Sequence, residues 1–442
     1  MNLCVIGTGY VGLVTGTVFA DLGNTVICVD KDIEKIGKLK RGEMPIYEPG
    51  LEEMVARNVD DARLFFSTDI GDGVRRSEVV FIAVGTPAGS DGYADLTAVK
   101  EVAKIIARNL DRYKVIVNKS TVPVGTGDMV HEIIDINKVR PDVEFDVVSN
   151  PEFLREGNAI KDTLFPDRIV IGAPHQNVAM RILELYAPLE RPMIITDVPS
   201  AEMIKYASNA FLATKISFIN AVANVCEKVN ADVTQVAKGM GFDQRIGNQF
   251  LSAGLGYGGS CFGKDTSCFL QTAEKLGYDF SLLKSVIEIN ALQPKLFVDK
   301  IKGALGSLSG KTIAVLGLAF KPDTDDLRDA KSIEIIADLL AADAKVKAYD
   351  PIAMENARKI YPHIEYCETA CDAAEDADAL VVVTEWNEFK FLDLGRVKET
   401  MKQPIIFDGR NMYDPDRMRR LGFDYYCVGR PPVKAAAEKV KI

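Results

Sequence analysis

The sequence predicts an α/β protein with two doubly wound parallel sheets, joined by a long central helix and a helical middle domain. In the first part of the chain, short β-branched runs alternate with helix-period segments, which is typical of a parallel sheet with crossover helices. A long apolar helical pattern begins at Ser200, and strand–helix alternation resumes after a glycine- and serine-rich stretch at residues 306–310. The length of 442 residues also indicates two or three domains rather than one core.

Five apolar runs in the first part are expected to form buried strands. Each is short and rich in β-branched or aliphatic residues, as strands covered on both faces usually are. They lie at residues 3–6, 25–29, 79–84, 114–118 and 146–149.

The middle of the chain is expected to be helical. Ser200 can cap a helix whose apolar positions continue well beyond an ordinary surface helix. A helix that is long and apolar around much of its circumference usually connects domains or forms a dimer interface. Its apolar positions include Ile204, Ala207, Phe211, Ile216 and Ile219.

The last part of the chain repeats the strand–helix pattern of the first. Strands are expected at residues 312–316, 345–349, 379–383 and 405–408. We therefore predict three domains, at residues 1–199, 200–305 and 306–442.

Composition excludes several classes of function. The net charge of −10 argues against a protein that binds nucleic acid or an anionic membrane, because phosphate backbones require a basic face. The eight cysteines show no disulfide framework, and neither they nor the three histidines form a metal-like cluster. The first residues run directly into a strand, so no signal peptide is expected, and no apolar run is long enough for a membrane span. We expect a reduced, cytoplasmic enzyme without a metal.

A glycine-rich turn near the N-terminus predicts a dinucleotide site. Gly7, Gly9 and Gly12 follow the first strand and precede an apolar helix, so backbone N–H groups can approach a pyrophosphate there. Asp30 closes the next strand, where a carboxylate accepts a hydrogen bond from a ribose hydroxyl. Because the same carboxylate repels a 2′-phosphate, NAD is favoured over NADP.

Cys261 is a candidate nucleophile. It lies in a glycine-rich loop at residues 258–265, next to Lys264 and Asp265, and a nearby cation or helix N-terminus favours the reactive thiolate. The other cysteines mostly fall in apolar segments and are better interpreted as small buried side chains. A purely structural Cys261 remains the alternative.

Polar residues at several strand ends suggest a ligand cleft. Lys205 and Asn209 are four residues apart on the long helix and point the same way, although two polar residues on a solvated face would do so too. Segments 85–87, 120–126 and 150–157 each follow a strand, and each can also be a simple helix cap or turn.

Together these motifs resemble the UDP-glucose/GDP-mannose dehydrogenase family, in the family's order and over nearly the whole chain. Residues 243–251 and Ser260 resemble the branch that acts on UDP-glucose, while Tyr257 and Gly263 stand where relatives often have Phe and Pro. The segments that carry the resemblance are residues 7–12, 85–87, 120–125, 150–157, 205 with 209, 258–265 and 320–324.

The resemblance implies a four-electron oxidation of UDP-glucose to UDP-glucuronate that reduces two NAD per sugar. Cys261 would attack the intermediate aldehyde to give a thiohemiacetal, which is oxidised to a thioester and then hydrolysed. Glu152 would be the base for the hydrolytic water, and Lys205 would stabilise the oxyanion. Asp265 and Thr121 would orient a water or take the proton of the first oxidation; both roles are open.

The same resemblance assigns ligand contacts. Arg245 would reach the sugar site of a neighbouring subunit, so a homodimer is expected. NAD contacts would come from Val11, Asp30, Lys35, Thr86, Thr121, Glu156, Lys264 and Arg328. Substrate contacts would come from Glu152, Phe153, Leu154, Glu156, Lys205, Asn209, Phe250, Leu251, Ser252, Ala253, Gly254, Gly258, Lys321 and Arg410.

Three alternatives remain. A GDP-mannose 6-dehydrogenase would carry out the same chemistry on another sugar nucleotide. A two-electron dehydrogenase of hydroxy acids or sugar acids would use Lys205 and Asn209 and leave Cys261 structural. A non-catalytic NAD-binding regulator would bind the cofactor without turnover.

Overall fold

The computed structural model describes residues 1–89 and 92–435, whose contacts divide them into two compact units. The first unit comprises Met1–Ser208 and Ser267–Leu276; the second comprises Asn209–Thr266 and the described chain from Gly277 onward. Two helices, α9 (Val198–Val229) and α11 (Phe262–Lys275), run from one unit into the other. Over the described ranges, no helix is both long and apolar enough to cross a membrane.

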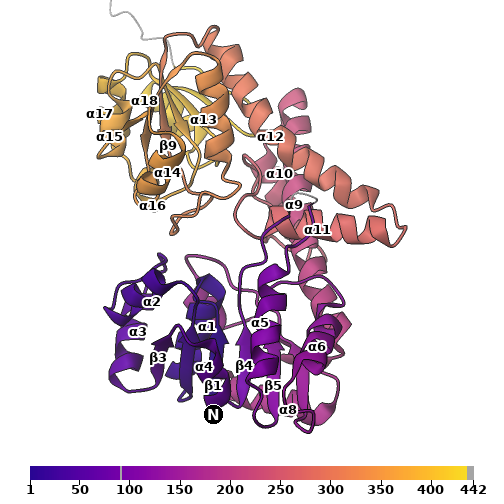
Figure 1. Cartoon of the computed structure of the whole chain (residues 1–442). Coiled ribbons are helices and arrows are strands. Elements are labelled where there is room, and N and C mark those ends of the chain that lie inside the picture. The colour runs from indigo at the N-terminus through magenta and orange to yellow at the C-terminus, as the bar shows by residue number, and fades with distance from the viewer. Residues whose placement is uncertain (90–91, 436–442) are drawn as a thin grey trace, which may run out of the picture. The chain divides into compact units, whose positions relative to one another are not determined.

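The sheet of the first unit has eight strands in the order β3-β2-β1-β4-β5-β6-β7-β8 (Figure 1). The first six follow the doubly wound order, in which strand order reverses between β1 and β4. β7 pairs antiparallel with β6 through Ser149 and Gly172, a junction that the sequence did not predict. The strands are β1 (Asn2–Ile6), β2 (Thr25–Val29), β3 (Leu64–Ser67), β4 (Val79–Ile82), β5 (Lys114–Asn118), β6 (Phe145–Ser149), β7 (Ile169–Gly172) and β8 (Met193–Thr196).

Helices cover both faces of this sheet. One core contains buried side chains of α1, α2, α3, α7 and α8, and the other contains those of α4, α5 and α6. In α5 the buried positions Val99, Val102, Ala103 and Ile106 recur at helical spacing, which places them all on the sheet. The helices are α1 (Tyr10–Asp21), α2 (Ile33–Lys40), α3 (Leu51–Asp60), α4 (Ile70–Arg76), α5 (Thr97–Arg108), α6 (Thr126–Asn137), α7 (Ala159–Leu164), α8 (Gln176–Tyr186) and the 3-10 turn η1 (Ala187–Leu189).

The second unit contains a six-stranded parallel sheet in the order β11-β10-β9-β12-β13-β14. This order repeats that of the first six strands of the first unit, so the prediction of two doubly wound sheets is confirmed. The strands are β9 (Thr312–Leu316), β10 (Lys345–Tyr349), β11 (Glu365–Tyr366), β12 (Ala379–Val382), β13 (Ile405–Asp408) and β14 (Asp424–Cys427). The helices are α10 (Val233–Gly241), α12 (Ser281–Leu305), α13 (Lys331–Ala341), α14 (Met354–Ile360), α15 (Ala370–Ala374), α16 (Asn387–Lys390), α17 (Leu394–Thr400) and α18 (Pro415–Leu421).

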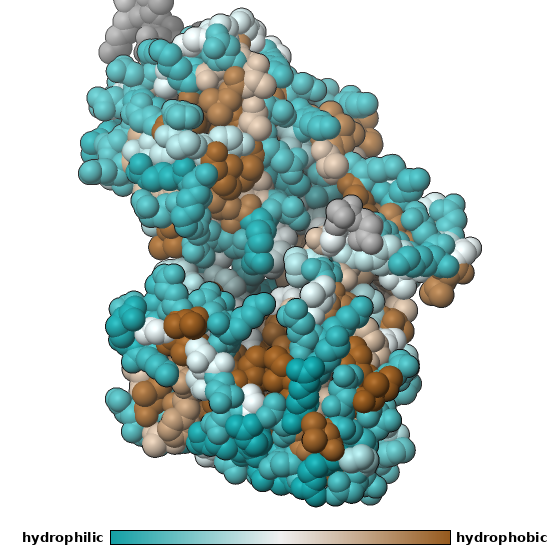
Figure 2. All heavy atoms as spheres, in the orientation of Figure 1, coloured by the Kyte–Doolittle hydropathy of each residue, from teal (hydrophilic) through white to brown (hydrophobic). Residues whose placement is uncertain are grey.

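Helix α9 is the long helix expected from the sequence, and it begins two residues before Ser200. Within the second unit it packs on α12: Ser217 Oγ donates to Val286 O at 2.9 Å, and Asn224 Nδ2 donates to Gln293 Oε1 at 3.2 Å. On the face shown in Figure 2, hydrophilic residues cover most of each unit and hydrophobic residues form small separate patches.

Candidate active site

The turn between β1 and α1 has room only for glycine at two of its positions. Gly7 has a φ of +107°, and a Cβ there would meet Ala83 O at 2.4 Å; a Cβ on Gly12 would meet Gly7 O at 1.9 Å. Gly9, the N-cap of α1, has no atom within 4 Å of its Cβ position and no side-chain cap. The N-terminus of α1, with the half-buried Val11 in its first turn, is therefore open to a phosphate group, and this turn fits a dinucleotide.

Asp30, just after β2, is a carboxylate held in place by the same turn. Its Oδ2 accepts from Thr8 N at 2.9 Å and Thr8 Oγ1 at 2.8 Å, and Lys35 Nζ lies 3.4 Å away. Burial opposes ionisation of Asp30, but the hydrogen bonds from Thr8 and Asp32 and the Lys35 charge outweigh it and hold its pKa below the ordinary value. Asp30 is therefore an ionised acceptor at neutral pH.

The segments that follow β4 and β5 are tied together. Thr86 Oγ1 donates to Thr121 O at 2.9 Å, and Ser120 Oγ donates to Val84 O at 2.7 Å. Thr86 and Ser120 are buried, whereas Thr121 is half-buried. These residues lie at the carboxyl edge of the sheet near its switch point, where doubly wound sheets bind ligands.

Glu152 and Lys205 form a buried ion pair in the first unit. Lys205 Nζ donates to Glu152 Oε1 at 3.0 Å and to Glu152 O at 2.5 Å, and Glu152 Oε2 accepts from Leu154 N at 2.8 Å. The Phe153 ring centroid lies 5.3 Å from Lys205 Nζ. The side chains are only 7% and 4% exposed, so the pair carries fixed charges in a low-dielectric setting.

Two acidic residues that the sequence analysis missed hold neighbouring backbone segments of the first unit. Glu48 accepts from Gly157 N and Ala159 N, both at 2.7 Å, and so holds the segment that contains the buried Glu156. Glu202, one turn before Lys205 on α9, accepts from Gly125 N and Gly127 N, both at 2.8 Å. These bonds cap α6, whose N-cap glycine has no side chain to do so.

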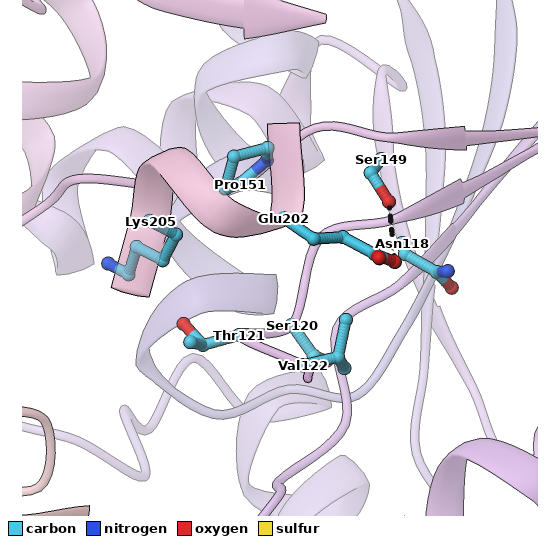
Figure 3. A pocket seen from close by; sticks show the side chains of 8 residues that line it. All are labelled: Asn118, Ser120, Thr121, Val122, Ser149, Pro151, Glu202 and Lys205. Carbon is cyan, nitrogen blue, oxygen red and sulfur yellow. Dashed lines mark hydrogen bonds between the residues drawn. The ribbon is translucent and has the colours of Figure 1, made fainter. Parts of the chain in front are cut away.

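A small pocket adjoins Lys205. Ser149 Oγ donates to Glu202 Oε1 at 3.2 Å inside it, and burial raises the pKa of Glu202 (Figure 3). The ammonium of Lys205 points away from Glu202 and Asn118 (Figure 3). The pocket is lined by Asn118, Ser120, Thr121, Val122, Ser149, Pro151, Glu202 and Lys205.

In the second unit, Asp265 is the centre of a buried polar cluster. Asn209 Nδ2 donates to Asp265 Oδ2 at 2.6 Å, and Lys264 Nζ donates to Asp265 Oδ1 at 2.5 Å. The Asp265 side chain is 1% exposed. The sequence analysis expected Lys205 and Asn209 on the same side of the helix. In the structure they bind different acids: Lys205 pairs with Glu152, and Asn209 donates to Asp265.

Cys261 is exposed and directly precedes helix α11. Its carbonyl accepts from Asp265 N at 2.8 Å, and its Sγ lies 3.6 Å from Ser260 Oγ. The positive end of a helix favours a thiolate over a thiol. Among the other cysteines in the described part of the chain, only Cys371 is not buried.

The glycines before Cys261 allow its loop to pack closely on segment 320–329. A Cβ on Gly258 would meet Asp329 O at 2.3 Å, and one on Gly259 would meet the Phe320 ring at 2.6 Å. Gly259 N also donates to Arg328 O at 2.8 Å. Backbone proximity, rather than flexibility, therefore explains this glycine pair.

Several of the expected substrate residues gather near the carboxyl edge of the second sheet. Arg410 donates through Nε to Val383 O at 2.7 Å and through Nη2 to Phe320 O at 3.3 Å, and Lys321 Nζ lies 5.4 Å from the Phe320 ring centroid. A Cβ on Gly254 would meet Gly409 O at 2.9 Å. These two cations can meet a diphosphate.

The remaining expected residues are placed differently. Leu251 and Ala253 are buried in the apolar core, whereas Ser252 is exposed and Phe250 has a φ of +63°. Arg328 pairs with Asp326. Arg245 pairs with Asp243, is 89% exposed, and forms no hydrogen bond or ion pair with the other expected substrate residues that the structure describes.

Comparisons with known proteins identify relatives over nearly the whole chain. Three domain models of the UDP-glucose/GDP-mannose dehydrogenase family match: the NAD-binding domain at residues 1–190, the central domain at 199–292 and the UDP-binding domain at 314–415. The chain is 53% identical to the UDP-glucose 6-dehydrogenase TuaD of Bacillus subtilis, covering 98% of this chain and 94% of that one. It is 50% identical to the UDP-glucose 6-dehydrogenase of Rhizobium meliloti, covering 98% and 100%.

A solved structure is similar as well. It is a UDP-glucose dehydrogenase from the hyperthermophilic archaeon Pyrobaculum islandicum, with a TM-score of 0.90 and 38% sequence identity. The similarity covers 96% of each chain.

Proposed function

The chain belongs to the UDP-glucose/GDP-mannose dehydrogenase family and is an NAD-dependent enzyme, and from this premise we propose that it oxidises UDP-glucose to UDP-glucuronate. The names of relatives at 50% and 53% identity support the choice of substrate. The observation that carries the four-electron chemistry is the exposed thiol of Cys261 at the N-terminus of α11. An alcohol-to-aldehyde oxidation alone has no need of it.

We assign one region of the chain to each ligand. Residues 1–199 bind NAD through the glycine turn, Asp30, Lys35 and Thr86. Residues 306–442 bind the UDP group through Lys321 and Arg410. Residues 200–305 carry Cys261 and its supporting residues.

One UDP-glucose and one water give one UDP-glucuronate, two hydrides and three protons. NAD, when bound, accepts one hydride in each of the two oxidations. Asp265 is held by Asn209 and Lys264. It accepts the proton of the C6 hydroxyl through a water molecule. Cys261 then adds to the aldehyde carbon, which keeps the sugar bound as a thiohemiacetal.

The second oxidation leaves a thioester on Cys261, and two residues act in its removal. Lys205 stabilises the oxyanion that develops at the C6 oxygen. Glu152 takes a proton from the water that attacks the thioester, and the departing sulfur regains its thiol form. Burial of the Glu152–Lys205 pair strengthens both effects because the local dielectric is low.

We expect two NADH for each UDP-glucose consumed, measured by absorbance with limiting sugar and excess NAD. A ratio of one would mean that the aldehyde is released, which contradicts the thiol mechanism. If UDP-glucose gave no NADH but GDP-mannose was oxidised, the assignment of UDP-glucose as substrate would be wrong, whereas the proposed type of reaction would stand.

Replacing Asp30 by serine is expected to raise the KM for NAD about 10- to 100-fold, because a charged hydrogen bond worth about 1.5–3 kcal/mol to the ribose is lost. The KM for NADP is expected to fall, since the repelling carboxylate is gone. Steady-state kinetics with both cofactors tests this. Asp32→Ser is the matched control: Asp32 caps α2 two residues away, and its loss should leave the NAD/NADP preference unchanged.

We also propose a homodimer that forms through α9. Phe211, Phe218 and Val225 recur every seven residues on this helix, and each is more than half exposed. A monomeric mass in analytical ultracentrifugation would contradict this.

We further infer a cytoplasmic location, where the thiol of Cys261 stays reduced. Cell fractionation tests it.

A further inference from the structure

Lys119 is a buried lysine that neither the sequence motifs nor the proposed mechanism uses. It directly follows β5, and its backbone N–H donates to Ile82 O at 2.9 Å in the sheet. The residue is 6% exposed, so its side chain runs into the protein rather than into solvent. It lies two residues before Thr121 in the segment that reaches the proposed site.

The hydrogen-bond partners of Lys119 are neutral. Nζ donates to Asn150 Oδ1 and to Tyr186 Oη, both at 3.1 Å, and Tyr186 Oη donates to Asn150 Oδ1 at 2.5 Å. Asn150 Nδ2 donates in turn to Val170 O at 2.7 Å. Three groups therefore set the orientation of the Asn150 side-chain amide, and Asn150 opens the segment that carries Glu152.

A buried ammonium whose hydrogen-bond partners are neutral is costly, and a methionine of similar length would fill the space without that cost. Burial, partly offset by the Glu152 carboxylate and reinforced by the charge of Lys205, lowers the pKa of Lys119 to about 8. Lys119 thus carries its charge at neutral pH and interacts with both members of the proposed catalytic pair. The ionisable groups that face it are Tyr186 from α8, Glu152 after β6 and Lys205 from α9.

We propose that Lys119 is a positioning residue, which orders the Asn150–Glu152 segment and places a second buried positive charge beside the Glu152–Lys205 pair. The role of Glu152 and Lys205 in turnover rests on the function proposed above. Lys119 itself is not assigned any contact with substrate or cofactor. It acts through Asn150 and through its electric field.

The sign of the effect follows from its charge. A buried positive charge stabilises a nearby negative one, so removing the charge of Lys119 should make the ionised form of the proposed base less favourable. We therefore expect Lys119→Met to move the acidic limb of the kcat/KM profile for UDP-glucose upward by about half to one pH unit. At pH values below the limb, this shift corresponds to about three- to tenfold lower kcat/KM.

The alkaline limb should behave differently. Above pH 8 the wild-type Lys119 is itself largely neutral, so wild type and Lys119→Met should converge there. Lys119→Arg, which keeps its charge throughout, should restore the acidic limb toward that of wild type. A purely structural residue would lower activity by the same factor at every pH.

The matched control is Lys114→Met. Lys114 is a buried lysine at the other end of the same strand, where it donates to Ser77 O at 2.8 Å and pairs with Asp111 at 2.8 Å. Its loss should lower the Tm but leave the acidic limb in place. An unshifted limb in Lys119→Met, or an equal shift in Lys114→Met, would overturn the proposal.

A second readout does not need turnover. In protein with ¹³C-labelled lysine, the Lys119 Cε resonance, assigned by its absence in Lys119→Met, should titrate at higher pH in Lys205→Met than in wild type, because the charge of Lys205 lowers the pKa of Lys119. If wild type fails to oxidise UDP-glucose, the proposed function falls, and this titration still decides whether Lys119 and Lys205 interact. An unchanged Lys119 titration would remove the electrostatic role.

Discussion

Replacing Cys261 by alanine is expected to lower kcat for the oxidation of UDP-glucose to UDP-glucuronate by at least about a thousandfold, the scale of losing a nucleophile. Without the thiol, the aldehyde has no covalent hold and no thiohemiacetal to be oxidised. Residual turnover should yield at most one NADH per sugar. Because Cys261 is exposed, the free energy of unfolding should change by no more than about 0.5 kcal/mol.

The matched control is Cys371→Ser, which removes the other cysteine of the described chain that is not buried. It should keep two NADH per sugar and near-wild-type kcat. Rapid acid quench of wild type during turnover, followed by peptide mass spectrometry, should show the sugar nucleotide on the Cys261 peptide. Two NADH per sugar from Cys261→Ala would show instead that water, not the thiol, captures the aldehyde.

The central strands of both sheets could be predicted because parallel strands covered on both faces are continuous apolar runs. The strands that the sequence analysis missed lie mainly toward the sheet edges, and all except the buried apolar β7 lack that signal. β8 has half-buried and exposed residues throughout, and β11 is only two residues long. Their pairing is decided by neighbouring strands rather than by their own composition.

The glycine turn and Asp30 could be predicted together because they lie within one βαβ unit, so local sequence determines their geometry. The hydrogen-bond and ion-pair partners of the proposed catalytic residues could not be predicted. Lys205 and Glu152 are 53 residues apart, and Glu48 and Gly157 are 109 apart. No spacing rule links such pairs, because the tertiary fold alone brings them together.

Lys119 and Glu202 illustrate a different limit. A charged residue next to polar ones at a strand end or helix start is usually interpreted as solvated, and nothing in the sequence indicates that its side chain points inward. The available signal was weak: Glu202 is an acid one turn before Lys205 on the long helix. Only the structure shows that both side chains are buried.

Replacing Lys205 by methionine is expected to lower kcat about 100- to 1,000-fold, the usual loss when a group that stabilises an oxyanion is removed. The KM for NAD should change little, since the NAD-binding turn lies elsewhere in the sequence and makes no use of Lys205. The variant should also be less stable by about 3 kcal/mol, because Glu152 is left as a buried carboxylate without its ion-pair partner. Loss of activity could therefore reflect either catalysis or damage to the local structure.

The double variant Lys205→Met/Glu152→Gln separates these two causes. Removing both charges takes away the uncompensated carboxylate, and similar replacements of buried ion pairs are often neutral for stability. Its free energy of unfolding, from urea titration, should return to near the wild-type value, while kcat stays low because neither the oxyanion charge nor the hydrolytic base is present. If activity returned together with stability, Lys205 would be a structural residue, and the oxyanion would have to be stabilised by another group. If stability returned without activity, the buried Glu152–Lys205 pair would serve catalysis and would not be needed for the stability of the fold.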